Sequence, residues 1–353
     1  MATIDTLLNE ILERRASDLH LIAGDPPRMR LYGDLQPLKP ERLDPQAVRD
    51  ALYEIMPKAA VNRFESKDGA DFAYTLADRG RFRVNVMRHL SGVGAVFRAI
   101  PSRAMTLDEL KLPEAVRQMC NASNGLILVT GKTGSGKSTT LAAMIDDINS
   151  RVKGHILTIE DPIEFVHPRK SCLVSQREIG VHAPSFSSAL LSALREDPDV
   201  ILVGELRDLE TISIAVTAAE MGILVMGTLH TNGAAPTVDR IVNVFPADKQ
   251  SHVRTMLSTS LRGVVSQQLL QRADKEGRVA ALEILVNTPA VANLIRQGKL
   301  DQLESTMQSG AQFGMRTMDA ASQQLLEQRV ITGKEAYKKG ISKARFEAVK
   351  DQG

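Results

Sequence analysis

The chain has 353 residues, more than one hydrophobic core usually serves, so its length predicts two domains. Hydrophobic residues make up 43% of it and charged residues 24%, as in globular proteins, and no apolar run is long enough to cross a bilayer. The net charge is +2, only 4% of the residues are aromatic, and no stretch of the sequence is both basic and rich in aromatic residues. These features disfavour nucleic acid as a partner. The amino terminus lacks the order of a secretion signal, so we expect a cytoplasmic protein.

The first hundred residues predict a small α+β domain. Apolar spacing predicts its elements, which are helices at 3–14 and 45–66 and strands at 18–21, at 29–32 and within 71–98. The domain is expected to span 1–100, and residues 101–112 are expected to link it to the rest of the chain.

From Asn124 onward strands alternate with helices, which is the pattern of a mostly parallel sheet and predicts an α/β domain over 113–353. The expected strands are 126–130, 155–160, 199–203 and 222–229, with helices at 137–149 and 185–195. Beyond Pro246 the chain is predicted to be mainly helical, with one apolar helix face over 253–265 and a hairpin turn at 274–277. The polar tail after Lys334 is expected to fray.

A glycine-rich segment from Gly131 to Ser138 matches the phosphate-loop pattern GxxxxGK[ST] at every fixed position, between a predicted strand and a predicted helix. Its backbone amides and the positive end of the helix dipole would hold phosphate groups. Lys137 is expected to reach the β- and γ-phosphates of ATP, and the Ser138 hydroxyl to bind Mg²⁺. The predicted cofactor-binding residues are Thr133, Gly134, Ser135, Gly136, Lys137, Ser138 and Thr139.

Acidic residues follow two predicted strands, where ligands sit in an open α/β sheet. One strand ends at Glu160, with Glu164 shortly after, and another is followed by Glu205. Gly204 stands where the second NTPase motif usually has aspartate, so Glu205 suits a catalytic base better than a Mg²⁺ ligand. Two alternatives stay open: Glu205 as a solvated acid paired with Arg207, and salt-bridging rather than water or metal positioning by Glu160 and Glu164.

His230 follows a further apolar strand, which is consistent with sensing of the γ-phosphate, contact with a neighbouring subunit or a purely structural place. Four arginines lie on predicted strands of the first domain, namely Arg81, Arg83, Arg88 and Arg98. Ring ATPases often use arginines to neutralise transition-state charge, but on their own these four would be solvated edge charges.

These motifs together resemble the PilT family of type IV pilus retraction ATPases, within the secretion ATPase superfamily. The matching stretches are Gly131 to Thr140 (Walker A), Leu157 to His167 (Asp box), Leu194 to Ile212 (Walker B) and Met226 to Pro246 (His box). The resemblance implies a PAS-like first domain, a RecA-like second domain with a helical C-terminal region, and a homohexameric ring. It also implies Glu205 as catalytic base, Glu160 and Glu164 as Asp-box acids, His230 as the His-box residue, and Arg83 and Arg98 reaching the phosphates.

The function that the resemblance implies is Mg²⁺-dependent ATP hydrolysis that powers pilus retraction and twitching motility. The ring would be bound peripherally to the inner membrane, on a platform protein of the pilus base. One alternative is a PilU-like accessory motor that works with a second retraction ATPase. A RecA-like nucleic-acid translocase is another. The segment Ala290 to Gln297 reads AVANLIRQ where the family motif resembles AIRNLIRE, so coupling to the pilus is a point where this chain departs from the family.

Overall fold

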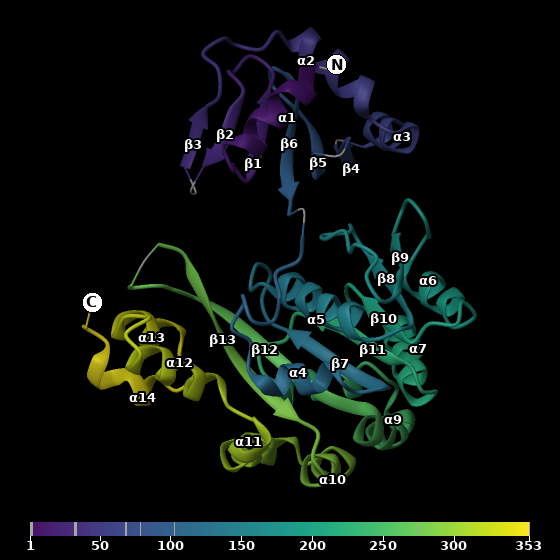
Figure 1. Cartoon of the computed structure of the whole chain (residues 1–353), viewed down its shortest axis with the longest axis vertical. Helices are drawn as coiled ribbons and strands as arrows, with labels where there is room; N and C mark the ends of the chain where they lie inside the picture. The colour runs from purple at the N-terminus through teal and green to yellow at the C-terminus, as the bar shows by residue number, and fades with distance from the viewer. Residues whose placement is uncertain are drawn as a thin grey trace. The chain divides into compact units, whose positions relative to one another are not determined.

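The computed structural model describes residues 3–352, apart from 32, 33, 68, 78, 102 and 275, and divides the chain into two compact units (Figure 1). The first unit comprises Met1–Arg103 and Glu164–Val166, and the second comprises Ala104–Ile163 and His167–Gly353. Tyr32 and Lys275, which belong to an expected strand and an expected turn, lie outside the described residues.

The first unit is built on a six-stranded antiparallel sheet with the strand order β3-β2-β1-β6-β5-β4. Its elements are α1 (Thr3–Glu13), β1 (Asp18–Ile22), β2 (Arg28–Leu31), β3 (Asp34–Pro37), α2 (Pro45–Ile55), α3 (Lys58–Ser66), β4 (Gly69–Leu76), β5 (Gly80–His89) and β6 (Gly92–Ile100). Alternation along the strands buries Leu19, Val84 and Phe97 completely on the core face. The helix predicted over 45–66 is two helices, because Pro57 holds the preceding residue in an extended conformation.

The second unit contains a seven-stranded sheet with the order β13-β12-β7-β11-β10-β8-β9, in which only the β12–β13 pair is antiparallel. Its strands are β7 (Gly125–Thr130), β8 (His155–Glu160), β9 (Leu173–Glu178), β10 (Val200–Val203), β11 (Leu224–Leu229), β12 (Leu261–Gln271) and β13 (Arg278–Val286). Every residue of β7, β10 and β11 is buried, as expected for strands covered on both faces.

The helices of the second unit are α4 (Glu114–Cys120), α5 (Lys137–Arg151), α6 (Phe186–Ala193), α7 (Leu209–Glu220), α8 (Ala234–Asn243), α9 (Ala247–Ser260), α10 (Pro289–Gln297), α11 (Leu303–Ser309), α12 (Met318–Glu327), α13 (Gly333–Lys339) and α14 (Lys343–Phe346). The last three gather beside the β12–β13 hairpin (Figure 1). The mostly parallel sheet preceded by a smaller α+β unit confirms the predicted fold class. Among the described residues, no helix is both long enough and apolar enough to span a membrane.

Two expectations for the C-terminal third were wrong. The helix face predicted over 253–265 ends at Ser260, and Leu261 begins β12. Consecutive residues from Gly263 to Gln267 are buried in this strand, so the helical spacing of the apolar residues arises there by coincidence. Gly263 permits this strand to pack closely, since a Cβ there would lie 2.3 Å from Met119 Cε. The tail after Lys334 does not fray over the described residues, because Phe346 is fully buried against the C-terminal helices.

Candidate active site

The parallel strands of the second unit bring several predicted site residues to one edge of the sheet. Thr130 of β7 pairs with Leu229 of β11, and Val203 of β10 pairs with both Gly227 of β11 and Ile159 of β8. The next residues along these strands therefore emerge at the same edge, and they are Gly131, His230, Gly204 with Glu205, and Glu160. Ligands bind at this edge in open α/β sheets.

The phosphate loop adopts a backbone that only glycine allows at its key positions. Gly131 has φ +138°, and a Cβ there would lie 2.3 Å from the carbonyl oxygen of Gln267. Gly136 has φ +90° and is the N-cap of α5, so the N-cap residue has no side chain to cap the first amides of that helix. The loop is thus shaped as a concave array of backbone groups at a helix start, which is the geometry of an anion site.

Two side chains of the loop point to the same conclusion. Lys137 is nearly buried, and its Nζ donates hydrogen bonds to the carbonyl oxygens of Gly131 at 2.8 Å and Lys132 at 3.2 Å. Burial lowers the pKa of Lys137, and the nearby charge of Glu205 opposes that shift. Ser135 Oγ is buried and has no hydrogen-bond partner in the part of the chain that the structure describes. The cradle thus offers a cation and an uncompensated hydroxyl to a phosphate.

Glu205 lies directly after β10 and is held by two neighbours. Its Oε1 contacts Arg207 Nε at 2.6 Å and His230 Nε2 at 3.0 Å. Burial favours the neutral acid, but the hydrogen bond and charge of Arg207, together with His230, outweigh it, so the pKa of Glu205 is lowered. The pairing with Arg207 that the sequence left open is present, and His230 joins it from the end of β11.

The residues beside Glu205 explain the unusual second motif. A Cβ on Gly204 would lie 3.2 Å from the carbonyl oxygen of Ile159 and 3.3 Å from Glu160 Cα, so an aspartate at this position would be crowded. Glu160 is buried at the end of β8, where it accepts hydrogen bonds from Thr158 Oγ1 at 2.7 Å and Gln176 Nε2 at 3.3 Å. A carboxylate is therefore supplied at this edge by the neighbouring strand, not by residue 204.

The remaining predicted residues belong to the first unit. Glu164 groups with that unit. Arg83 and Arg98 are cross-strand neighbours on β5 and β6, and Arg98 Nε donates to Asp18 Oδ1 at 2.9 Å. Arg88 is an unrelated case, since it contacts Glu65 and lies over the Phe64 ring.

One side chain that supports the phosphate loop was missed from the sequence. Gln267 Oε1, buried on β12, accepts a hydrogen bond from Thr140 Oγ1 at 2.8 Å, and so ties the first turn of α5 to the sheet. The pattern gave no signal for it, because the segment just before it was expected to be helical and Thr140 is 127 residues away.

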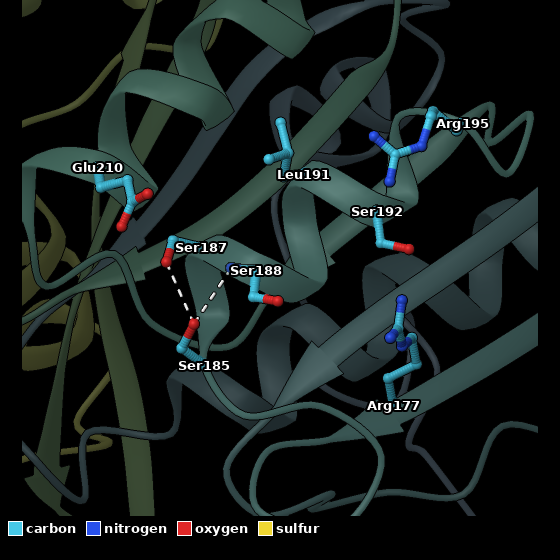
Figure 2. A pocket seen from close by; sticks show the side chains of 8 residues that line it. All are labelled: Arg177, Ser185, Ser187, Ser188, Leu191, Ser192, Arg195 and Glu210. Atoms are coloured by element: carbon cyan, nitrogen blue, oxygen red, sulfur yellow. Dashed lines mark hydrogen bonds between the residues drawn. The ribbon is translucent and has the colours of Figure 1, made fainter.

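A separate hollow of about 580 Å³ lies along α6 (Figure 2). None of the predicted site residues lines it. Its polar groups are already engaged in part, since Ser185 accepts a hydrogen bond from the Ser188 amide and Arg177 pairs with Glu196 at 3.0 Å. We assign no role to this hollow.

The fold and the phosphate loop, with an acid and a histidine at adjoining strand ends, define a P-loop ATPase. Comparison with known proteins specifies the branch. A family model described as type II/IV secretion system protein matches residues 1–312. The type IV pilus retraction ATPase PilT of Pseudomonas aeruginosa strain PAO1 is 50% identical over 336 residues, covering 95% of this chain and 97% of that protein. The type IV pilus ATPase PilU of the same strain is 41% identical, covering 94% and 87%.

A crystal structure of the pilus retraction motor PilT with bound ADP superposes with a TM-score of 0.91 at 43% identity, covering 98% of this chain and 99% of that one. The chain belongs to the type II/IV secretion system proteins and, within them, to the PilT family of type IV pilus retraction ATPases.

Proposed function

We propose that this chain is a homohexameric motor that hydrolyses ATP with Mg²⁺ and uses the energy to retract type IV pili. The observation that carries the proposal is the convergence of the Lys137 loop, Glu205 and His230 at one sheet edge. The identity of 50% to a retraction ATPase over 95% of the chain supports the biological role. The proposed place of work is the inner-membrane base of the pilus, on a platform protein.

The phosphate loop supplies the binding part of the mechanism. The amides of Thr133 to Thr139 and the Lys137 ammonium would hold the β- and γ-phosphates. Ser138, exposed in the first turn of α5, would hold Mg²⁺. Mg²⁺ would neutralise charge on the phosphate oxygens.

Glu205 would act on the attacking water. Its lowered pKa keeps it ionised at neutral pH, so it would accept a hydrogen bond from the water and orient it. The transition state of phosphoryl transfer is loose, so orientation matters more than strong basicity. His230 Nε2 lies 3.0 Å from the Glu205 carboxylate and would respond to the γ-phosphate. Glu160 and Glu164 would position water or metal, and Arg83 and Arg98 would neutralise transition-state charge.

A phosphate-release assay on purified protein tests the chemistry. We expect Lys137→Ala to abolish hydrolysis, and Glu205→Ala to bind ATP while lowering kcat by at least about 100-fold. Lys153→Ala, which removes an exposed lysine just beyond α5, should keep the wild-type rate. Hydrolysis by Glu205→Ala at the wild-type rate would show that Glu205 is not the base.

The accessory-motor alternative differs from the proposed function in its role in the cell and not in the chemistry of its active site. Higher identity to PilT than to PilU, 50% against 41%, favours the principal retraction motor. Deleting this gene alone should abolish twitching motility, whereas an accessory motor would leave retraction driven by the second ATPase. Stimulation of the ATPase by DNA would instead favour a translocase.

A further inference from the structure

One row of residues crosses the sheet directly beneath the candidate active site. Glu283 of β13 pairs with Ser266 of β12, and Ser266 pairs with Thr130, the last residue of β7 before the phosphate loop. Thr130 pairs in turn with Leu229, the last residue of β11 before His230. Three of these side chains are polar although all are buried. Buried polar groups at such positions need partners.

The partners of this row lie in the segment that follows His230. Glu283 Oε1 accepts a hydrogen bond from the Ala234 amide at 2.7 Å, and Ser266 Oγ accepts one from the Gly233 amide at 2.9 Å. Thr237 Oγ1, on α8, lies 2.7 Å from Thr231 Oγ1. We call residues 231–234 the His230 loop. Its end is therefore fastened to the sheet through two side-chain acceptors.

The helix α8 is capped by a side chain from β13 and not by its own N-cap residue. The N-cap residue of α8 is Gly233, which has no side chain to cap it, whereas Thr288 and Thr332 cap α10 and α13 with their own hydroxyls. Glu283 supplies the missing acceptor from β13. A carboxylate next to the positive end of a helix dipole is also electrostatically favourable.

The second oxygen of the same carboxylate reaches the C-terminal helices. Glu283 Oε2 accepts a hydrogen bond from the Met318 amide at 3.1 Å, where α12 begins. Burial raises the pKa of Glu283, and the two backbone amides oppose that shift. One buried carboxylate thus caps two helices, one of which starts at the end of the His230 loop.

We propose that Glu283 is a positioning residue for ATP hydrolysis: it fixes the His230 loop and thereby holds His230 against Glu205. The inference rests on the proposed function, because it assigns Glu283 an effect through the Glu205–His230 contact of 3.0 Å. Glu283 touches neither nucleotide nor water in this scheme. Its effect is on the rate of turnover, not on the binding of ATP by the phosphate loop.

Glu283→Gln is the primary test, because glutamine keeps the shape but offers one acceptor oxygen to two amide donors. We expect kcat to fall about tenfold while KM for ATP stays within about twofold. The matched control is Asp319→Asn. Asp319 is also a buried carboxylate that accepts from two backbone amides, those of Ile341 at 2.7 Å and Ser342 at 2.8 Å, but these lie in the C-terminal tail.

The control separates positioning from stability. Both variants lose a buried hydrogen bond, so both should lower Tm, but only Glu283→Gln should lower kcat of the folded protein. Equal kcat values for the two variants would overturn the inference. If Glu283→Gln fails to fold, Ser266→Ala is the second test, because it removes the neighbouring hydrogen bond from the Gly233 amide. We expect Ser266→Ala to lower kcat by a smaller factor than Glu283→Gln. An unchanged kcat for Ser266→Ala would overturn the inference.

A double variant tests the route through His230. If Glu283 acts by placing His230, Glu283→Gln should lower kcat little further in a His230→Ala background. Factors that multiply in full would overturn the route. A wild-type kcat for His230→Ala would instead show that the proposed role of His230 is wrong. A slow His230→Ala beside a Glu283→Gln as fast as Asp319→Asn would leave the proposed function intact and defeat this inference alone.

Discussion

Two arginine–carboxylate pairs, one in each unit, use the same contact for opposite purposes. In the second unit Arg207 Nε lies 2.6 Å from Glu205, and the carboxylate is the group with the predicted chemistry. In the first unit Arg98 Nε lies 2.9 Å from Asp18, and the arginine is the group with the predicted chemistry. Both contacts are made through Nε of the guanidinium.

Burial shows which member of each pair is fixed. Asp18 is 3% exposed while Arg98 is 68% exposed, so the carboxylate is the anchor and the guanidinium is presented outward. Glu205 is 18% exposed and is shared with His230, so it is oriented at the sheet edge while Arg207 lies outside at 67%. An ion pair alone therefore does not indicate which of its two residues has the proposed chemistry. The exposure of each side chain and its position in the fold are needed as well.

Among changes to the two pairs, the largest expected effect comes from removing the outward guanidinium of the first pair. Arg98→Ala should lower kcat by about a thousandfold, within the range seen for arginines that neutralise phosphoryl-transfer charge, while Tm changes little because the side chain is exposed. Arg88→Ala is the control, since its guanidinium lies over the Phe64 ring and pairs with Glu65. Near wild-type turnover by Arg98→Ala would show that Arg98 does not neutralise charge in the transition state.

The second prediction concerns pH and the other pair. Arg207 lowers the pKa of Glu205, so Arg207→Ala should raise that pKa and move the acidic limb of the kcat/KM profile to higher pH. Glu205 can act as a base only when it is ionised, and its pKa is lower in the wild type than in the variant. The wild type should therefore retain activity at a lower pH than the variant. Circular dichroism across the same range excludes unfolding. An acidic limb that does not move would mean that another group controls it.

Local motifs were predictable because their meaning lies within a few residues. The phosphate loop has fixed spacing from Gly131 to Ser138, and an apolar run that ends in an acid or a histidine marks a strand end. The parallel order of those strands then places Glu205 and His230 at one edge. Sequence alone could therefore predict that the phosphate loop, Glu205 and His230 lie at one edge of the sheet.

Supporting contacts were not predictable, because they join residues that are distant along the chain. Glu283 reaches Ala234 across 49 residues, and Gln267 reaches Thr140 across 127. Both depend on the β12–β13 hairpin, and the first residues of β12 mimic a helical apolar face since they are buried on both sides. A pattern shows that a residue is buried but not which backbone amide it meets.

The smallest expected effect separates anchoring from charge in the first pair. Asp18→Asn keeps an oxygen that accepts from Arg98 Nε but removes the negative charge, so we expect kcat to fall only about threefold. The decisive comparison is with the Arg98→Ala background, where Asp18→Asn should have no further effect on kcat, because Asp18 then has no guanidinium to hold. A further drop there would assign Asp18 a role of its own. That result would break the symmetry between the two pairs, since Asp18 would then resemble Glu205 and not an anchor.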